Sequence, residues 1–294
     1  MHQNERPSTG ILSGKKVADE IYANLKQKLD NRGDVRAPGL AVILVGEDPA
    51  SMTYTSSKAK NAEKLGIHSQ ILRFAEDLSE AELLGEIETL NRDETIDGIL
   101  VQLPLPPHID AAKVQRAIKP EKDVDGFHPT NLGLLLQNEP GLRPCTPQGI
   151  MRLLEHYDIP LAGAEAVVLG RSNIVGKPMA QLLLQADATV SQLHSKSRDR
   201  AKHLAEADLV VVAIGQPEQV KIDELRPGSV VIDVGIHRTS TKKLVGDVEH
   251  GAEEKVLVTP VPGGVGPLTV AQLMDNCVRA WEVNTGQNGA CDER

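Results

Sequence analysis

Residues 166–178 read Ala-Val-Val-Leu-Gly-Arg-Ser-Asn-Ile-Val-Gly-Lys-Pro, and the elements that they predict set the architecture of the C-terminal half. Four apolar residues lead into Gly170, and a segment with helical periodicity follows Gly176. The pattern therefore predicts a buried strand, a tight turn and a helix. Backbone N–H groups at such a turn face the pyrophosphate of a bound dinucleotide. The glycine spacing departs from Gly-x-Gly-x-x-Gly, so the turn alone is equally consistent with an ordinary strand–helix connection.

The alternation of strands and helices continues on the C-terminal side of this unit. Apolar runs predict the strands, and periodic apolar positions predict the helices between them. The expected strands cover residues 166–169, 189–193, 209–214, 229–234 and 256–259, and the expected helices cover residues 177–185 and 198–207. Strands that alternate with helices form a parallel sheet, so this half is predicted to be a Rossmann-like domain.

The N-terminal half shows the same alternation. Ser79 and Glu82 have the spacing of a capping box at the start of one helix. The expected elements are helices over residues 16–31, 50–64 and 79–91, and strands over residues 40–46, 69–74 and 98–103. The chain is therefore predicted to be an α/β protein with two α/β domains, the second of them the Rossmann-like parallel sheet.

Two segments rich in Pro and Gly separate these patterns. Residues 104–147 are expected to form active-site loops, after which Thr146 caps a helix running to Leu154, with Pro147 at its first position. After residues 260–267, one long final helix is expected over residues 268–283.

Composition excludes several classes of protein. The net charge is −9 and aromatic residues make up 2%, which argues against an anionic membrane surface and against nucleic acid as a partner. Three cysteines without a CxxC pair favour a reducing cytoplasm, and scattered histidines predict no metal site. The N-terminus shows no targeting signal, and no apolar run reaches membrane-spanning length.

A polar loop follows the second strand of the C-terminal half. NAD enzymes place a carboxylate near this position to hold the ribose 2′-hydroxyl. Here the residues are His194, Ser195, Lys196 and Ser197, and Arg171 lies in the preceding turn. Hydroxyl and cationic donors suit a 2′-phosphate, which favours NADP over NAD, although an ordinary solvated loop would have the same composition.

Several polar residues in the N-terminal half are candidates for a site, and each also has a structural interpretation. Tyr54 and Lys58 lie one helical turn apart and share a face that is more often simply solvated. Gln102 interrupts an apolar strand, which indicates a satisfied hydrogen bond or a site. Asp125 precedes Gly126, where it is either functional or a turn residue. Residues 259–269 combine glycines and prolines that admit a planar ligand or form a rigid hinge.

From about Leu12 to Trp281, the chain resembles the bifunctional methylenetetrahydrofolate dehydrogenase/methenyltetrahydrofolate cyclohydrolases. The segments that carry the resemblance are residues 96–106, 122–128, 144–147 and 260–267. It implies oxidation of 5,10-methylenetetrahydrofolate by NADP⁺ and then hydrolysis to 10-formyltetrahydrofolate. It also implies a homodimer, an active-site cleft between the domains, a folate-binding catalytic domain over residues 1–147 joined by residues 268–294, and an NADP-binding domain over residues 148–267.

The resemblance assigns roles to individual residues. Lys58 is implied to be the central catalytic residue, tuned by Gln102, while Tyr54 stacks on the folate and Asp125 holds the pterin. The implied folate-binding set also includes Val101, Leu103, Pro262, Gly263, Gly264, Val265 and Gly266. The implied NADP-binding residues are Gly170, Arg171, Ser172, Ser195 and Ile236.

Three other interpretations remain open at this point. The first is a dehydrogenase of the same family without useful cyclohydrolase activity, and the presence of Tyr54, Lys58 and Gln102 counts against it. An unrelated NADP-dependent dehydrogenase of the shikimate type does not explain Asp125 or residues 262–267. A non-enzymatic protein would bind NADP without turnover.

Overall fold

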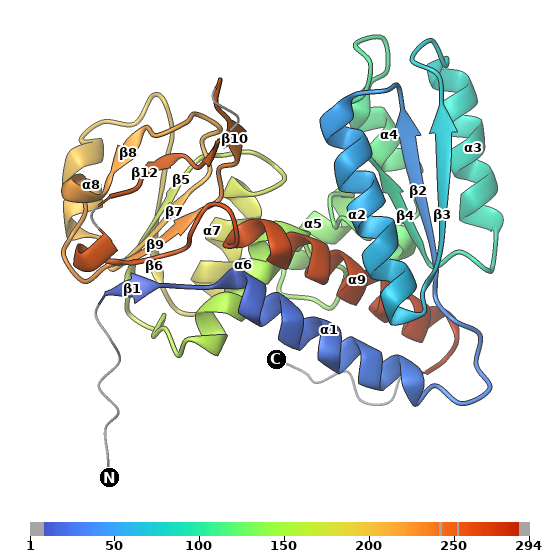
Figure 1. Cartoon of the computed structure of the whole chain (residues 1–294), viewed down its shortest axis with the longest axis horizontal. Coiled ribbons are helices and arrows are strands. Elements are labelled where there is room, and N and C mark those ends of the chain that lie inside the picture. Colours follow the sequence, from blue (N-terminus) through green and yellow to red (C-terminus); the bar gives the residue numbers. More distant parts are fainter. Residues whose placement is uncertain (1–8, 241–242, 252, 288–294) are drawn as a thin grey trace. The chain divides into compact units, whose positions relative to one another are not determined.

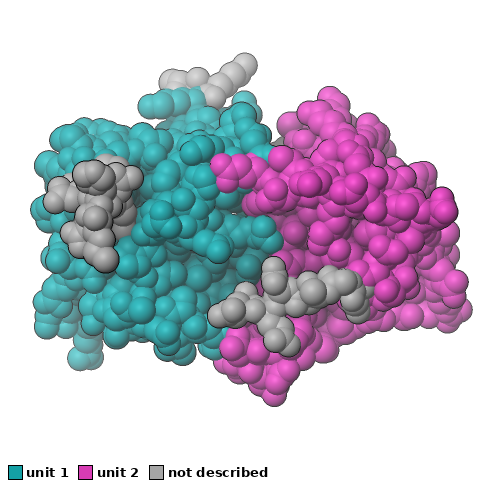
Figure 2. All heavy atoms as spheres, turned by 90° about the horizontal axis from the view of Figure 1, so that it is seen from below, with its two compact units in different colours: residues 1–19, 146–269 teal, residues 20–145, 270–294 magenta. Residues whose placement is uncertain are grey.

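The computed structural model describes residues 9–240, 243–251 and 253–287 (Figure 1). The chain divides into two compact units, which Figure 2 shows in different colours. Unit 1 consists of Met1–Asp19 and Thr146–Thr269, and unit 2 consists of Glu20–Cys145 and Val270–Arg294. Helices α1 (Gly14–Asp30) and α9 (Val265–Asn284) each contribute residues to both units.

A parallel sheet forms the centre of unit 1, as the sequence predicted. Its strands follow the order β1-β13-β9-β7-β5-β6, and every neighbouring pair is parallel. The strands are β1 (Gly10–Ile11), β5 (Glu165–Leu169), β6 (Thr189–Leu193), β7 (Leu209–Val212), β9 (Val230–Asp233) and β13 (Leu257–Val258). Aliphatic side chains such as Val210 and Val231 are fully buried, because helices cover a sheet of this kind.

The strand order in unit 1 reverses between β5 and β7. The chain leaves β5 for β6 on one side and then returns to pair β7 on the other side of β5. In a doubly wound sheet, ligands bind beyond the carboxyl ends of the strands at such a reversal. The helices here are α6 (Cys145–His156), α7 (Gly176–Gln185) and α8 (Arg200–Glu206).

β1 joins the sheet of unit 1, whereas the sequence analysis assigned the whole N-terminus to the first domain. Gly10 N donates to Val256 O at 2.9 Å, and Leu12 N donates to Val258 O at 2.8 Å. A strand of two residues leaves no periodic pattern in a sequence, which is why it was not predicted. For the same reason, two further pairs of short strands were not predicted. These are β10 (His237–Arg238) with β11 (Leu244–Val245), and β12 (Val248–Glu249) with β8 (Val220–Lys221).

Unit 2 contains a smaller parallel sheet in the order β3-β2-β4. Its strands are β2 (Gly39–Val45), β3 (His68–Phe74) and β4 (Gly98–Val101). The central strand β2 is buried throughout its length, which explains its continuous apolar sequence. Helices α3 (Glu80–Arg92) and α4 (Ala111–Ala117) pack on the face that carries Ala41 and Ile43. Figure 1 shows α2 (Pro49–Leu65) beside the same sheet.

Local structure in unit 2 follows the sequence at most helix ends. The capping box of Ser79 and Glu82 is present at the start of α3. The segment expected to form only loops contains α4 and a further helix, α5 (Pro129–Leu136). The helices have only 7 and 8 residues, which is shorter than the window over which a helical period can be recognised in a sequence.

Two predicted helix starts were wrong. α6 begins at Cys145, so Thr146 lies within its first turn and does not cap it; Thr146 Oγ1 instead shares a hydrogen bond of 2.8 Å with Thr269 Oγ1. α9 begins at Val265, three residues before the expected start. Proline is tolerated in a first helical turn, so Pro267 does not delay the helix. No helix in the described ranges is both long and apolar enough to cross a bilayer.

Candidate functional site

Lys58 and Gln102 form a hydrogen-bonded pair in unit 2. Lys58 Nζ donates to Gln102 Oε1 at 3.0 Å, and Gln102 Nε2 donates to the carbonyl oxygen of Leu103 at 2.7 Å. The backbone of Gln102 is fixed as well, because its N–H donates to Ile43 O at 2.9 Å. Both ends of the amide are therefore engaged, and its oxygen faces the lysine.

Lys58 lies on helix α2, which is capped at both ends. Asp48 caps the helix by accepting from Ser51 N at 2.7 Å, and Gly66 ends it with a left-handed φ of 81°. Ser51 and Thr55 are buried on the side that packs against the unit. Tyr54 is 44% exposed, and Lys58, one turn further along, is half-buried. The two side chains thus occupy the border between the packed and solvated faces.

Asp125 lies close enough to Lys58 for their charges to interact. Burial raises the pKa of Asp125 to about 6, while the positive charge of Lys58 acts in the opposite direction. Gly126 turns the chain after it with φ +76°, and a Cβ there would lie 2.4 Å from the carbonyl carbon of Arg143. Only glycine fits this close approach, so the course of the chain directly after Asp125 depends on Gly126.

Helix α9 holds the loops on either side of Asp125. Asn276 Nδ2 donates to Val124 O at 2.9 Å and to Arg143 O at 2.8 Å. Gln272, one turn earlier, donates to Asn276 Oδ1 at 3.2 Å. Sequence analysis missed both residues, although a pair of amides four residues apart inside an apolar helix was a usable signal.

Cys145 is a buried structural residue beside these loops. Its Sγ donates to Val124 O at 3.2 Å, and its N–H donates to Asp125 O at 3.3 Å. Burial raises the pKa of the Cys145 thiol well above its ordinary value, with Asp125 acting in the same direction. A thiol of this kind is a poor nucleophile.

The arrangement in unit 2 supports proton transfer. In the described part of the chain, no ion pair engages Lys58, and its recorded partner is a neutral amide. An amide orients the amine without forming a salt bridge, so the amine can exchange a proton with a ligand. Val101 is buried at the end of β4, and Leu103 is half-buried after Gln102.

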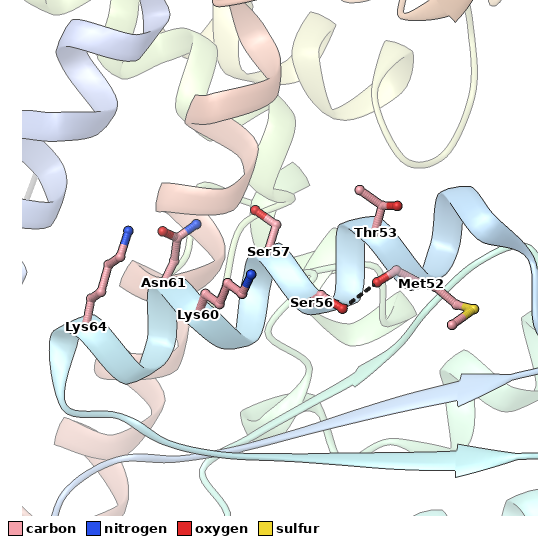
Figure 3. Close-up of a pocket in the computed structure, with 7 residues that line it drawn as sticks. All are labelled: Met52, Thr53, Ser56, Ser57, Lys60, Asn61 and Lys64. Atoms are coloured by element: carbon pink, nitrogen blue, oxygen red, sulfur yellow. Dashed lines mark hydrogen bonds between the residues drawn. The ribbon is translucent and has the colours of Figure 1, made fainter.

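An open groove runs along a neighbouring face of α2 (Figure 3). Its volume is about 560 Å³, and the predicted catalytic residues do not line it. The lining residues are Met52, Thr53, Ser56, Ser57, Lys60, Asn61 and Lys64. Because one helix supplies all of them, the groove is a surface feature, distinct from the Lys58–Gln102 pair.

In unit 1, the turn after β5 is tightly packed and leads directly into α7. Gly170 has φ +124°, and a Cβ there would lie 2.2 Å from Ala213 O. A Cβ on Gly176 would lie 2.4 Å from Gly170 O. Ser172 Oγ accepts from Val175 N at 3.2 Å and from Gly176 N at 3.3 Å, which orders the turn before α7. Both glycines are therefore required for close packing of the backbone, and the turn leads into a helix N-terminus, which is where a dinucleotide places its pyrophosphate.

The loop after β6 carries the residues expected to select the cofactor. Lys196 N donates to His194 Nδ1 at 3.1 Å, and His194 N donates to Ser197 Oγ at 2.9 Å. These bonds fold the loop and leave the side chains of Ser195 and Lys196 exposed, as is Arg171 after the neighbouring strand β5. The loops thus offer donors suited to a phosphate at one edge of the sheet.

The remaining predicted residues also follow strands of the unit 1 sheet. Ile236 comes after β9 and is 47% exposed. Pro262 follows a cis peptide bond after β13, and Gly263 O accepts from Lys15 N at 2.9 Å. A Cβ on Gly264 would lie 2.5 Å from Pro260 O. Val265 and Gly266 lie in the first turn of α9, where the sequence analysis expected a loop.

The predicted residues divide between the two units. The first set is in unit 2 and consists of Tyr54, Lys58, Val101, Gln102, Leu103 and Asp125. The second is in unit 1 and consists of Gly170, Arg171, Ser172, Ser195, Ile236, Pro262, Gly263, Gly264, Val265 and Gly266. Among the described residues, no group of His, Cys, Asp and Glu side chains has the arrangement of a metal site.

Models of one family match both halves of the chain. The catalytic-domain model of the tetrahydrofolate dehydrogenase/cyclohydrolase family matches residues 12–125, and the NAD(P)-binding-domain model of the same family matches residues 144–285. The bifunctional protein FolD of Bordetella avium is 54% identical over 275 residues, which cover 93% of this chain and 96% of its own. The bifunctional protein FolD of Lactococcus lactis subsp. lactis is 51% identical over 281 residues, covering 95% and 99%.

Solved structures give the same result. The bifunctional enzyme FolD of Campylobacter jejuni superposes with a TM-score of 0.90 at 45% identity, covering 95% of this chain and 99% of its own. FolD of Trypanosoma brucei, complexed with NADP cofactor and an inhibitor, has a TM-score of 0.89 at 36% identity, covering 94% and 98%. The resemblance inferred from the sequence is confirmed: this chain belongs to the tetrahydrofolate dehydrogenase/cyclohydrolase family.

Proposed function

We propose that this chain is a bifunctional enzyme that oxidises 5,10-methylenetetrahydrofolate to 5,10-methenyltetrahydrofolate and then hydrolyses it to 10-formyltetrahydrofolate. The family models cover a catalytic domain and an NAD(P)-binding domain, and the relatives that match most of the chain are bifunctional. The observation that carries the hydrolytic activity is the hydrogen bond from Lys58 to Gln102.

Residue roles follow from the chemistry of each step. When bound, NADP⁺ supplies the hydride acceptor of the first reaction. Hydrolysis needs a group that takes a proton from the attacking water and returns one as the ring opens. We assign that group to Lys58, because an amine can give up and take back a proton, whereas the guanidinium of an arginine stays protonated. Gln102 holds the amine in place for both transfers.

The other residues of unit 2 position the folate. Tyr54 is half-exposed on the face of α2 next to Lys58, where an aromatic ring is available for stacking. Asp125 accepts hydrogen bonds from pterin N–H groups when it is ionised. Val101 and Leu103 flank Gln102 and line the same site. The folate contacts assigned to Pro262, Gly263, Gly264, Val265 and Gly266 rest on the family resemblance.

The preference for NADP rests on the loops after β5 and β6. Residues 194–197 contain no Asp or Glu to hold a ribose 2′-hydroxyl, while Arg171, Ser195 and Lys196 are exposed. Gly170 and Ser172 shape the turn for the pyrophosphate, and Ile236 offers an apolar contact. The FolD structure from Trypanosoma brucei contains NADP, which agrees with this assignment.

A coupled assay tests the proposal directly. The purified chain is given methylenetetrahydrofolate with NADP⁺ or NAD⁺, and NADPH, methenyltetrahydrofolate and 10-formyltetrahydrofolate are quantified separately. Methenyltetrahydrofolate is also supplied alone. We expect NADPH formation and hydrolysis of the added methenyl compound. NADPH formation without hydrolysis above the uncatalysed rate would identify a dehydrogenase-only member of the family.

We infer that the chain acts as a homodimer in the cytoplasm, with small folates as its partners and neither nucleic acid nor membranes. The homodimer follows from the family resemblance and agrees with Leu184 on α7 being 56% exposed and with β6 lying at the end of the described strand order. Free Cys145 and Cys277 agree with a reducing compartment. Light scattering measures the oligomeric state, and a mass equal to one chain would exclude the dimer.

A further inference from the structure

Two carboxylates in unit 1 are buried and have no part in the chemistry assigned above. Asp233 ends β9 and is 1% exposed, and Asp247 precedes β12 and is fully buried. A buried carboxylate is costly unless hydrogen bonds compensate for its lost hydration. The partners of these two side chains therefore show what they stabilise.

Asp247 holds the turn that follows β7. Its Oδ2 accepts from Ile214 N at 2.7 Å and from Gly215 N at 2.9 Å, and its Oδ1 accepts from Gln216 N at 2.9 Å. The same Oδ1 lies 2.7 Å from His237 Nε2. One carboxylate thus joins the turn at residues 214–216 to the segment that follows β9.

Asp233 holds Asp247 in turn. Its Oδ1 accepts from Asp247 N at 2.9 Å and from Gly235 N at 3.0 Å, and its Oδ2 accepts from Val248 N at 3.1 Å. His250 Nε2 lies 3.4 Å from the same Oδ2. The two carboxylates therefore form one continuous network of backbone hydrogen bonds.

Two glycines pack so closely against these carboxylates that neither position has room for a side chain. A Cβ on Gly235 would lie 2.5 Å from Asp247 Oδ1, and a Cβ on Gly246 would lie 1.7 Å from Asp233 Oδ2. The carboxylate of Asp247 thus packs on Gly235, two residues after Asp233, and the carboxylate of Asp233 packs on Gly246, which directly precedes Asp247. Such a fit fixes the backbone of the segments it joins.

Those segments border the proposed cofactor site. Ala213, at the start of the turn, touches the turn after β5, because a Cβ on Gly170 would lie 2.2 Å from its carbonyl oxygen. This is the reversal of strand order where a dinucleotide is expected to bind. His237 directly follows Ile236, which is assigned to the cofactor site.

We propose that Asp247 and His237 are positioning residues for NADP⁺. They fix the turn at residues 214–216 and the backbone of Ile236, and these two segments in turn orient the bound cofactor. The inference rests on the proposed function. Neither side chain is assigned a contact with a reacting atom. Asp247 is buried beneath the turn, and His237 is its partner from the neighbouring segment.

The test uses variants of His237, since it is half-buried and its removal leaves the backbone partners of Asp247 in place. In His237→Ala, we expect the Kd and KM for NADP⁺ to rise by up to about tenfold, because the bound cofactor must then order a turn that has lost one hydrogen bond to a charged group. kcat at saturating NADP⁺ should change much less. His237→Gln keeps an N–H donor and should recover most of the affinity, and His203→Ala on α8 serves as a matched control.

Hydrolysis of added methenyltetrahydrofolate without NADP⁺ provides the internal reference. A positioning role for the cofactor predicts that this rate is unchanged in His237→Ala, whereas general damage to the fold lowers it together with dehydrogenase activity. Asp247→Asn is compared by the same measurements if its thermal unfolding shows that it folds. Unchanged NADP⁺ affinity in folded His237→Ala, or equal loss of both activities, overturns the inference.

Direct titration of NADP⁺ separates this inference from the proposed function. If the wild-type chain binds NADP⁺ but does not turn over folate, the proposed activity fails, while the effect of His237→Ala on Kd still decides the inference. If the wild-type chain binds no NADP⁺, both fail.

Discussion

The amine of Lys58 and the amide oxygen of Gln102 lie 3.0 Å apart, although 44 residues separate them in the sequence. The two residues come from different elements, α2 and the end of β4, which the parallel sheet of unit 2 brings together. The other end of the amide is bound to a backbone carbonyl, so its orientation is fixed. A fixed neutral acceptor orients the amine without neutralising it.

We expect Lys58→Met to separate the two activities. Methionine keeps much of the apolar stem but removes the group that transfers protons. Because general acid–base catalysis contributes about 10²–10⁴-fold, hydrolysis should fall by that factor or more while part of the dehydrogenase activity survives. The measurement is the ratio of the two activities, with accumulation of methenyltetrahydrofolate as the direct sign.

Lys60→Met is the matched control, because Lys60 is an exposed lysine of the same helix that lines the open groove. It should leave both activities near the wild-type values. Gln102→Ala should reduce hydrolysis less than Lys58→Met, since the amine remains. An equal loss of both activities in Lys58→Met would mean that Lys58 mainly positions folate.

Much of the fold was predictable because long apolar patterns record it. The continuous apolar run expected to form a strand over residues 40–46 is β2, displaced by one residue, and the capping box of Ser79 marked α3. Short elements were not predictable, because two residues such as those of β1 or β12 contain no period. Their position depends on tertiary hydrogen bonds from segments far along the chain.

The site was predictable where a polar residue stood out from its surroundings, as Gln102 does at the end of an apolar strand. The supporting residues were not. Asn276 and Asp247 have roles defined by backbone groups more than 30 residues away, such as Val124 O and Ile214 N. No local pattern in the sequence records such a partner, so only the structure identifies them.

Cys145 should be dispensable for catalysis and inert as a thiol. It is 2% exposed, burial raises its pKa well above the ordinary value, and its Sγ donates to a backbone carbonyl. Serine keeps a donor at this position, so Cys145→Ser should retain activity. In a Cys291→Ser background, native protein should react with iodoacetamide far more slowly than protein unfolded in guanidinium. Rapid labelling of the folded protein, or loss of activity in a folded Cys145→Ser variant, would contradict this assignment.

Gly126→Ala should destabilise the protein and weaken folate binding together. The positive φ alone costs about 1–2 kcal/mol for a residue with a Cβ, and the contact with Arg143 adds to that cost. Gly133→Ala in α5 is the control, because nothing lies within 4 Å of its added Cβ and alanine favours a helix by about 1 kcal/mol. Urea unfolding compares the two variants. Equal unfolding free energies in both would show that the turn tolerates a side chain.

The double variant Arg171→Ala/Ser195→Asp should lose far more affinity for NADP⁺ than for NAD⁺. Each hydrogen bond lost to a charged 2′-phosphate is worth about 1.5–3 kcal/mol, and the new carboxylate repels the phosphate. Arg116→Ala on α4 controls for removal of an exposed arginine elsewhere. The ratio of kcat/KM for the two cofactors measures the effect. A uniform loss for both would place the 2′-phosphate elsewhere.

Asp125 gives the protein a specific dependence on pH. Burial raises its pKa to about 6, so the carboxylate is ionised at pH 8 and mostly protonated at pH 5. A protonated carboxyl loses acceptor capacity for pterin N–H groups, so the KM for folate should rise by up to about tenfold for each pH unit below 6. Asp125→Asn, which does not titrate, should have a higher KM that lacks this component.

The same pKa fixes the sign of a stability effect. Because the folded protein binds the Asp125 proton more tightly than the unfolded chain, the contribution of this group to the free energy of unfolding is present below about pH 4 and is lost as the pH rises through about 6. Asp125→Asn should therefore be more stable than the wild type at pH 8, and this advantage should shrink as the pH falls to 4. Asp34→Asn, the same substitution at an exposed position, is the matched control. Urea unfolding of the three proteins at pH 4.5, 6 and 8 measures the difference. An advantage of Asp125→Asn that grows toward low pH would show that the folded protein favours the ionised carboxylate.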